Sequence, residues 1–170
     1  MRRAFERLLV RLRDAGAEVV AADPDGLRRA AAAYTPLVRA EGADIHRDLL
    51  ATRPEALSPG VWEPLLAGCR VSAVDYLQAR RVRRLAQDGL AAALRPVDLL
   101  LAPANPTPAP LRDAFLHLTA PFSFTGVPVV SLSHDRIDGL PLGVQVIGGS
   151  GDDHRVMQAA AWLERVVADH

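Results

Sequence analysis

The stretch from residue 127 to residue 147, VPVVSLSHDRIDGLPLGVQVI, indicates the fold class more clearly than any other part of the chain. Its two ends, residues 127–132 and 142–147, are mostly apolar and rich in β-branched residues, which favours strands. The turn residues Asp138 and Gly139 predict that the chain reverses between these two strands. This stretch is therefore expected to contribute strands to a sheet.

The segments on either side alternate between helix and strand patterns. Residues 97–102 (VDLLLA) form a nearly continuous apolar run, as expected for a strand that is covered on both faces. Residues 72–94 predict the longest helix, and residues 152–168 predict a closing helix with one apolar face. Such alternation is typical of an α/β protein with a layered sheet flanked by helices.

The remaining segments complete this pattern. A helix over residues 2–15 is expected to stop at Gly16 and to be followed by a short buried strand over residues 17–22. Residues 27–50 predict an alanine-rich helix that is interrupted before Pro36, because proline disfavours helix at the preceding residue. The other predicted elements are a loop over 52–60, a short helix over 61–67, a proline-rich connector over 103–110 and a short helix over 112–118.

The long helix over residues 72–94 carries two kinds of side chain on two faces. Its spacing predicts a buried apolar face formed by Val74, Leu77, Val82 and Leu85. The opposite face is predicted to hold Arg80, Arg83 and Arg84. We expect this arginine face to be solvated, with a basic docking surface as the alternative.

Length, composition and charge exclude several classes of protein. With 170 residues, 18.3 kDa, 49% hydrophobic and 24% charged residues, the chain is expected to form a single domain over residues 1–170. Twenty basic residues balance twenty acidic ones, which argues against nucleic acid and anionic membranes as partners. A single cysteine, Cys69, excludes an internal disulfide and a cysteine-rich zinc site. No signal-like N-terminus and no long apolar run is found, so we expect a soluble, cytoplasmic protein.

The basic residues have a composition that limits the chemistry of the chain. All twenty are arginine, and the sequence contains no lysine. Arginine is too basic to act readily as a general base, whereas a desolvated lysine can lose its proton near neutral pH. Mechanisms that need a lysine, such as serine–lysine, Schiff-base and P-loop chemistry, are therefore excluded for this chain alone.

Three short clusters contain residue types that occur in catalytic or metal sites. The glycine-rich residues 148–151 lack a P-loop lysine and precede two aspartates, which favours a tight turn with an acidic helix cap. Residues 131–135 (SLSHD) have the residue types of a serine triad, but neighbours on a strand point to opposite faces. The spacing of Glu41, His46 and Asp48 favours a polar surface over a metal site. A triad drawn from distant segments remains an alternative, with its histidine among His46, His117 and His154.

Five segments, read in order, resemble one known family. Residues 97–104 (VDLLLAPA) are similar to the D-x-L-L-x-P strand of the amidase signature family, and residues 119–128 (TAPFSFTGVP) resemble its T-x-P-F-N-x-x-G-x-P segment. Residues 139–148 (GLPLGVQVIG) match G-L-P-x-G-x-Q-x-I-G. Upstream, residues 68–79 are similar to the family's G-x-x-x-x-A-x-D-Y-x-x-A helix, and residues 12–19 to its L-x-x-x-G-A-x-V step. The ordered set implies the C-terminal portion, about 40%, of an amidase fold, with a large mixed sheet flanked by helices.

The departures from the family pattern concern the reaction itself. The family hydrolyses carboxylic amides with a serine nucleophile, a bridging cis-serine and a lysine base, which all precede the matched segments. This chain has no lysine and no Ser-Ser pair, so the resemblance implies no catalytic residue here. Ser123 replaces the usual Asn, and Ser133 and Asp135 replace the usual Pro and Gly of P-x-G. These changes alter the expected shape of the local pocket.

The same resemblance implies a contribution to substrate binding. It assigns part of the pocket wall to Phe122, Ser123, Thr125 and Gly126. The alternative is that these residues only form a turn and a strand entry, with Gly126 and Pro128 shaping the backbone. No metal and no cofactor is implied.

Two functions are consistent with these observations. In the first, the chain is half of a split amidase and is inactive without a complementing N-terminal chain that carries the serines and the lysine. In the second, it is a non-catalytic remnant or an interaction module with an amidase-like fold. In both cases an unpaired sheet edge and an apolar face predict a homo-oligomer or a hetero-oligomer.

Overall fold

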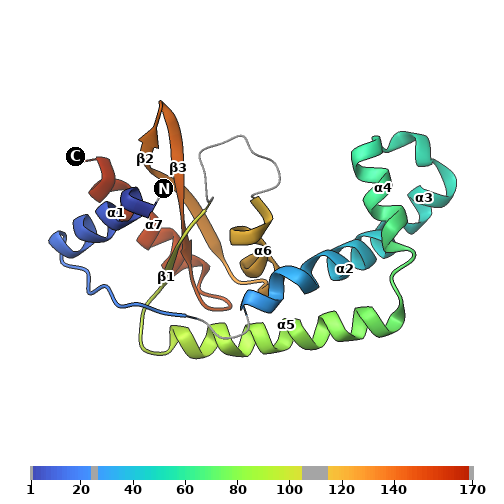
Figure 1. Cartoon of the computed structure of the whole chain (residues 1–170), viewed down its shortest axis with the longest axis horizontal. Coiled ribbons are helices and arrows are strands. Elements are labelled where there is room, and N and C mark those ends of the chain that lie inside the picture. The colour runs from blue at the N-terminus through green and yellow to red at the C-terminus, as the bar shows by residue number, and fades with distance from the viewer. Residues whose placement is uncertain (1, 24–26, 105–114, 169–170) are drawn as a thin grey trace.

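A computed structural model describes residues 2–23, 27–104 and 115–168. The predicted α/β class is confirmed, because helices flank both faces of a sheet (Figure 1). The elements, in chain order, are α1 (Arg2–Asp14), α2 (Leu27–Ile45), α3 (Arg47–Thr52), the short 3₁₀ helix η1 (Pro54–Ala56), α4 (Pro59–Gly68), α5 (Ala73–Leu94), β1 (Leu100–Pro103), α6 (Phe115–Thr125), β2 (Val129–Ile137), β3 (Leu140–Ile147) and α7 (Asp153–Ala168).

The three described strands form a sheet with the order β1-β3-β2. The predicted reversal at Asp138 and Gly139 is confirmed: φ is 51° and 78° at these residues, and positive φ at both positions of a two-residue loop favours a tight β-hairpin. β1 also pairs antiparallel with β3, so both described pairings are antiparallel rather than mixed. A two-residue turn can join only antiparallel strands, which explains the pairing of β2 with β3.

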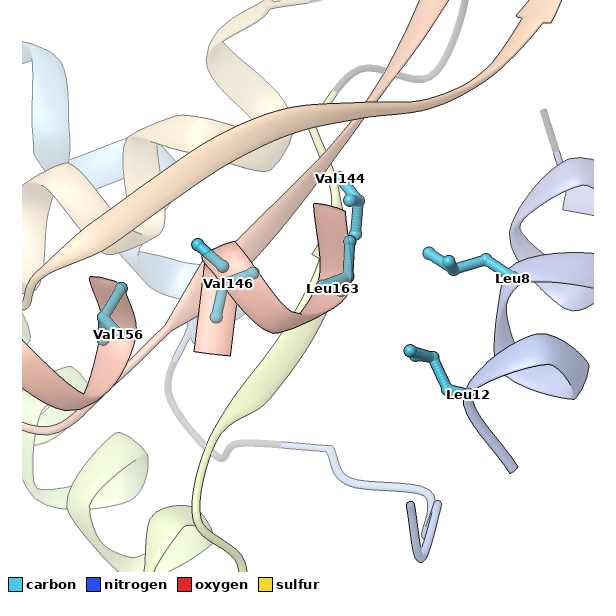
Figure 2. Close-up of a cluster of buried hydrophobic side chains, with 7 residues drawn as sticks. Leu8, Leu12, Val144, Val146, Val156 and Leu163 are labelled. Atoms are coloured by element: carbon cyan, nitrogen blue, oxygen red, sulfur yellow. The ribbon is translucent and has the colours of Figure 1, made fainter. Parts of the chain in front are cut away.

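One face of the sheet is covered by α1 and α7. Leu8 and Leu12 of α1 point toward β3 and toward Leu163 of α7 (Figure 2). The predicted apolar face of the closing helix is confirmed, since Val156, Ala160 and Leu163 are buried and Val167 is partly buried. We call α1, the three strands and α7 the sheet layer. The opposite face of the sheet is covered by α6 and the end of α5, where Leu90, Phe122 and Ile147 form a smaller cluster.

A second part, which we call the helical arm, consists of α2, α3, α4 and α5. These helices extend away from the sheet (Figure 1). α2 and α5 pack along each other through small side chains, and the buried members of this cluster are Ala30, Leu37, Ala79, Ala86 and Phe124.

The interruption predicted before Pro36 is wrong, because α2 runs without a break from Leu27 to Ile45. Proline removes one hydrogen bond inside a helix. The alanines on its N-terminal side favour helix, and Leu37 is buried against α5. Tertiary packing therefore holds the helix together across the proline.

The strand predicted over residues 17–22 is also wrong. These residues form no regular element and pair with no described strand. Ala17 and Val19 are partly buried against the sheet layer, whereas Glu18 and Val20 are exposed. The alternation of a strand is present, but a strand exists only when a neighbour accepts its backbone hydrogen bonds.

The long predicted helix is confirmed as α5, but its predicted buried face is wrong for three of its four residues, and only Val82 is partly buried. Val74 and Leu85 are 75% and 59% exposed, and Leu77 is also exposed. The buried residues of α5 are Ala79, Ala86 and Leu90. Alanines let α2 approach closely, so Ala79 and Ala86 form the buried centre of the contact, with Tyr76 and Val82 partly buried beside them.

The remaining short elements follow the sequence in part. α4 covers the predicted helix over residues 61–67, and α3 and η1 interrupt the predicted loop over 52–60. Pro103 of the predicted proline-rich connector belongs to β1, whereas residues 105–110 of the connector and the first part of the helix predicted over 112–118 lie outside the described residues. Within the described ranges, no helix is long and apolar enough to cross a bilayer.

Candidate functional site

The four pocket candidates lie at the C-terminal end of α6. Gln145 of β3 holds this helix against the sheet, because its buried side-chain amide donates to the carbonyls of Leu118 and Pro103, both at 3.1 Å. Gln145 is the glutamine of the G-L-P-x-G-x-Q motif. The motif residue therefore positions α6, and with it the pocket candidates.

The four candidates divide into two buried and two exposed residues. Phe122 and Thr125 are buried, whereas Ser123 and Gly126 are exposed. The Phe122 carbonyl accepts hydrogen bonds from Thr125 Oγ1 at 2.9 Å and from the Gly126 amide at 3.0 Å. Gln87 of α5 donates through Nε2 to the Thr125 carbonyl at 2.9 Å. Only the Ser123 side chain and the Gly126 backbone thus present themselves to a ligand at this surface.

Gly126 ends α6 with a left-handed backbone conformation. Its φ is 76°, a value that favours glycine. A Cβ atom added to Gly126 would lie 3.4 Å from Arg83 Nη2. The absence of a side chain at Gly126 therefore leaves the Arg83 guanidinium uncovered on this side.

Sequence reasoning placed Arg83 on a solvated face, and this interpretation is wrong for Arg83. Its side chain is only 36% exposed, and its Nε is buried without a hydrogen-bond partner in the described part of the chain. Arg83 Nη1 lies 3.9 Å from Glu41 Oε1 of α2, and the Tyr76 hydroxyl donates to the same carboxylate oxygen at 3.4 Å. Arg80 and Arg84 are exposed as expected.

One sequence signal could have identified this group. Positions 76 and 83 are two helical turns apart and share a face with the buried residues Ala79, Ala86 and Leu90. Of the three arginines considered for a basic docking surface, only Arg83 is partly enclosed, and it lies beside Gly126. We call Glu41, Tyr76, Arg83 and Gly126 the Arg83 cluster.

The triad-like residues 131–135 do not form a catalytic site in this structure. His134 is 3% exposed, neither ring nitrogen has a hydrogen-bond partner within the described residues, and Phe5 packs edge-on against the ring at 6.4 Å between centroids. Burial lowers the pKa of His134 below its ordinary value. Asp135 pairs with Arg7 Nη2 at 2.5 Å rather than with the histidine, and the Arg136 amide and Arg7 lower its pKa. His134 thus acts as an apolar filler under α1.

The other sequence clusters carry no described site. The distant-triad candidates His46 and His154 are exposed, and no described hydrogen bond joins either side chain to a serine; the side chain of His117 lies outside the described residues. Glu41 faces Tyr76 and Arg83, and the described residues contain no group of three or more histidine, cysteine or acidic side chains that could hold a metal ion. Residues 148–151 form a tight turn before α7, in which a Cβ on Gly148 would collide with Val156.

A groove of about 550 Å³ lies between α2 and α5, but it does not include the pocket candidates. Its lining residues are Arg29, Gln78, Arg81, Val82, Leu85, Asp88 and Gly89. Arg81 and Leu85 lie on the side of α5 opposite to Arg83, since each residue of an α-helix turns by about 100°. The groove and the Arg83 cluster are therefore separate surfaces.

Comparison with known proteins identifies relatives of this chain. The chain matches the Amidase family model over residues 1–157. It is 32% identical to AtzE, the 1-carboxybiuret hydrolase subunit of Pseudomonas sp. (strain ADP), covering 88% of this chain and 36% of the relative. It is 34% identical to a glutamyl-tRNA(Gln) amidotransferase subunit of Methanosarcina mazei, covering 75% of this chain and 30% of the relative.

Among solved structures, a crystal structure of an amidase has 40% sequence identity and a TM-score of 0.87, covering 98% of this chain and 42% of that protein. The chain thus spans less than half the length of these relatives. Sequence and fold agree over almost every described element. The chain belongs to the amidase signature family.

Proposed function

We propose that the chain is the C-terminal part of an amidase-type hydrolase, which cleaves carboxylic amide C–N bonds only together with a second chain. The observation that carries this proposal is the absence of lysine from a chain that covers 30% to 42% of the length of the relatives named above. The second chain would correspond to the N-terminal portion of the family's proteins. That portion contains the nucleophilic serine, the cis-serine and the lysine base. Because it has no lysine, this chain cannot supply the deprotonated amine that activates the serine in the family's mechanism.

In the assembled enzyme this chain would form one wall of the substrate pocket. Ser123 offers an exposed hydroxyl, and the Arg83 cluster offers a cation whose Nη2 lies beside Gly126. A guanidinium binds carboxylates through paired, charge-assisted hydrogen bonds. We infer that Arg83 binds an anionic group of the substrate, while Phe122 and Thr125 support the wall from inside.

A reconstitution experiment tests the proposal. The chain is purified alone and co-expressed with the remainder of the 40%-identical amidase, or with a lysine-containing Gly-Ser-Ser-Gly protein encoded beside it in the native host. Hydrolysis of simple amides is then measured for each preparation. We expect no turnover by the chain alone and saturable turnover by the complex.

The outcomes separate the two functions. Saturable hydrolysis by the purified chain alone would overturn the requirement for a complementing chain. Failure of every co-expressed partner to associate or to hydrolyse an amide would favour the non-catalytic remnant or interaction module. Light scattering of the chain alone measures whether it forms a homo-oligomer instead. The free, exposed Cys69 fits the reducing cytoplasm that we propose as the compartment.

The role of Arg83 is tested in the active complex. For an amide that carries a carboxylate, Arg83→Gln should raise KM by about tenfold to a hundredfold, which corresponds to the loss of a charge-assisted hydrogen bond of about 1.5–3 kcal/mol. Arg84→Gln is the matched control, because Arg84 is exposed on the same helix and pairs with Asp88 of that helix. An equal loss for neutral and carboxylate-bearing amides would contradict the anionic assignment.

A further inference from the structure

The free edge of β1 differs from the other edge of the sheet. β2 has a bulge between Ser133 and Asp135, and the charged residues Asp135 and Arg136 follow it. Bulges and charges are common devices that prevent an edge strand from pairing with another chain. β1 has neither a bulge nor a charge: its register with β3 is regular, and residues 99–104 contain no charged side chain. Its one proline, Pro103, stands at the C-terminal end of the strand.

The backbone geometry shows which groups of β1 are unpaired within the described sheet. The Ala104 amide donates to the Gly143 carbonyl at 2.9 Å, so alternate residues of β1, Ala102 and Leu100, direct their backbone groups toward β3. Leu101, between them, therefore directs its N–H and C=O away from the sheet. The outward position of Pro103 has no N–H to satisfy.

The side chains of β1 are those of an inner strand. Leu101 packs with the α1 and α7 cluster on one face, whereas Leu100 and Ala102 pack with the Phe122 cluster on the other. All three remain only half-buried. A strand added beside β1 would enter between two layers that are already formed and would complete the burial of these side chains.

A second segment that packs against the sheet layer also lacks a partner in the described sheet. Residues 17–22 have the alternation of a strand but pair with no described strand, and Val19 packs against the same cluster as Leu101. Two segments that contact the same cluster thus have backbone groups without a partner among the described strands. The solved amidase superimposes on 98% of this chain and is more than twice as long, so a large part of that protein is available to supply strands.

We propose that the free edge of β1 is the docking site for a β-strand of the complementing amidase chain, paired through the outward backbone groups of Leu101. The inference rests on the proposed function, because that function supplies the partner. A second copy of this chain is the competing occupant and forms one arm of the test.

Hydrogen exchange of individual amides tests the site without any substitution. The chain is measured alone and in complex with the co-expressed remainder of the 40%-identical amidase. The Leu101 amide should exchange at least about tenfold more slowly in the complex, because it becomes hydrogen-bonded. The Ser131 amide is the internal control: the Gly148 amide donates to the Pro128 carbonyl at 3.1 Å, so the same alternation directs Ser131 outward on β2.

A pair of proline variants tests the same contact. Leu101→Pro removes an N–H that β3 does not use, and should weaken assembly at least about tenfold by titration. Ser131→Pro makes the matched change on the protected edge and should leave assembly unchanged. Circular dichroism and thermal unfolding of each variant alone establish whether it is folded. If Leu101→Pro does not fold, hydrogen exchange of the Leu101 amide in the unmodified chain tests the same contact.

Each result decides between defined alternatives. A complex that hydrolyses amides while the exchange of Leu101 is unchanged would overturn the docking site and leave the proposed function intact. Failure to assemble and to hydrolyse would overturn both. Slow exchange of Leu101 in the chain alone, slowing further as protein concentration rises, would identify a second copy as the occupant and overturn the proposed partner.

Discussion

The sheet layer and the helical arm are built from different side chains and depend on different contacts. In the sheet layer, leucines of α1 and α7 interlock with valines of β3 (Figure 2). In the helical arm, α2 and α5 approach through alanines, and Phe124 of α6 is the largest buried member of the cluster. Large side chains bury more apolar area per contact, so the sheet layer has more stabilising surface than the arm.

The exposed apolar residues follow the same division. Ile45 and Val74 of the arm are 78% and 75% exposed, and the outer face of α5 also exposes Leu77 and Leu85. The sheet layer exposes fewer large apolar side chains among its described residues, including Val10 and Met157. The sheet layer therefore has a core of large apolar side chains, whereas the helical arm depends on a small cluster that consists mostly of alanines. Four measurements test that difference.

Phe124→Ala should have the largest effect. It removes the largest side chain from the α2–α5 cluster and should lower the free energy of unfolding by about 3–5 kcal/mol, measured by urea denaturation. In this variant, the amides of α2 and α5 should lose more protection from hydrogen exchange than the amides of β3. Leu85→Ala, at an exposed position of α5, is the control and should change stability by less than about 0.5 kcal/mol. Equal loss of protection in both parts would contradict the division.

Gly68→Ala should have the next largest effect on stability. A Cβ at Gly68 would collide with the backbone carbonyl of Arg39 in α2, so α4 must move away from α2. Such overpacking costs about 1–3 kcal/mol. Gly60→Ala in the same helix has free space around its Cβ and should stabilise the protein by about 0.5–1 kcal/mol. If the two variants changed the melting temperature equally, the close approach of α2 and α4 would be refuted.

The sheet layer should be the part that responds to mild acid. His134 is buried under α1 beside Arg7 and Arg11, with Asp135 as the neighbouring acid, and burial lowers its pKa from the ordinary 6.5. The unfolded chain therefore binds a proton first, and stability should fall as the pH falls below about 6.5. The lowered pKa of Asp135 acts in the same direction, but only below its ordinary value of 3.8.

His134→Phe separates the two contributions, because it keeps an aromatic ring and removes the titration. The variant should lose most of the decline in melting temperature between about pH 7 and pH 5. A decline equal to that of the unmodified chain would show that another group is responsible.

Arg7→Gln should have the smallest effect. The Arg7 side chain is 56% exposed, so its 2.5 Å ion pair with Asp135 is screened by solvent. Surface ion pairs contribute about 0–1 kcal/mol, and the urea midpoint should shift by a correspondingly small amount that disappears at high salt. Arg2→Gln, which removes a local pair within α1, is the control. A large shift that persists at high salt would show that the contact is more buried than the structure indicates.

Local signals predicted the elements that depend on neighbours in the sequence. The hairpin between β2 and β3 follows from two apolar, β-branched runs on either side of Asp138 and Gly139, and α7 follows from one apolar stripe. Predictions failed where contacts with distant segments determine the secondary structure. Residues 17–22 have strand alternation without a described partner, and α2 continues past Pro36 because α5 packs against it.

The candidate site shows the same limit. The motif around residues 119–128 located the end of α6, and the four pocket candidates there remain a prediction. Arg83 was missed because a charged residue is normally solvated, and only the packing of α2 and α6 against α5 encloses its Nε. Spacing along α5 shows that Tyr76 and Arg83 share a face, but it cannot show what lies opposite that face.

The sequence by itself determined which chemistry this chain lacks and which family it resembles, because both depend only on residue identity and order. Twenty arginines without a lysine exclude an internal lysine base in any conformation. The tertiary structure alone decided which face of α5 is buried, which arginine is enclosed and which sheet edge has no bulge. These properties depend on contacts between segments that are distant in the chain, and such contacts exist only after the chain has folded.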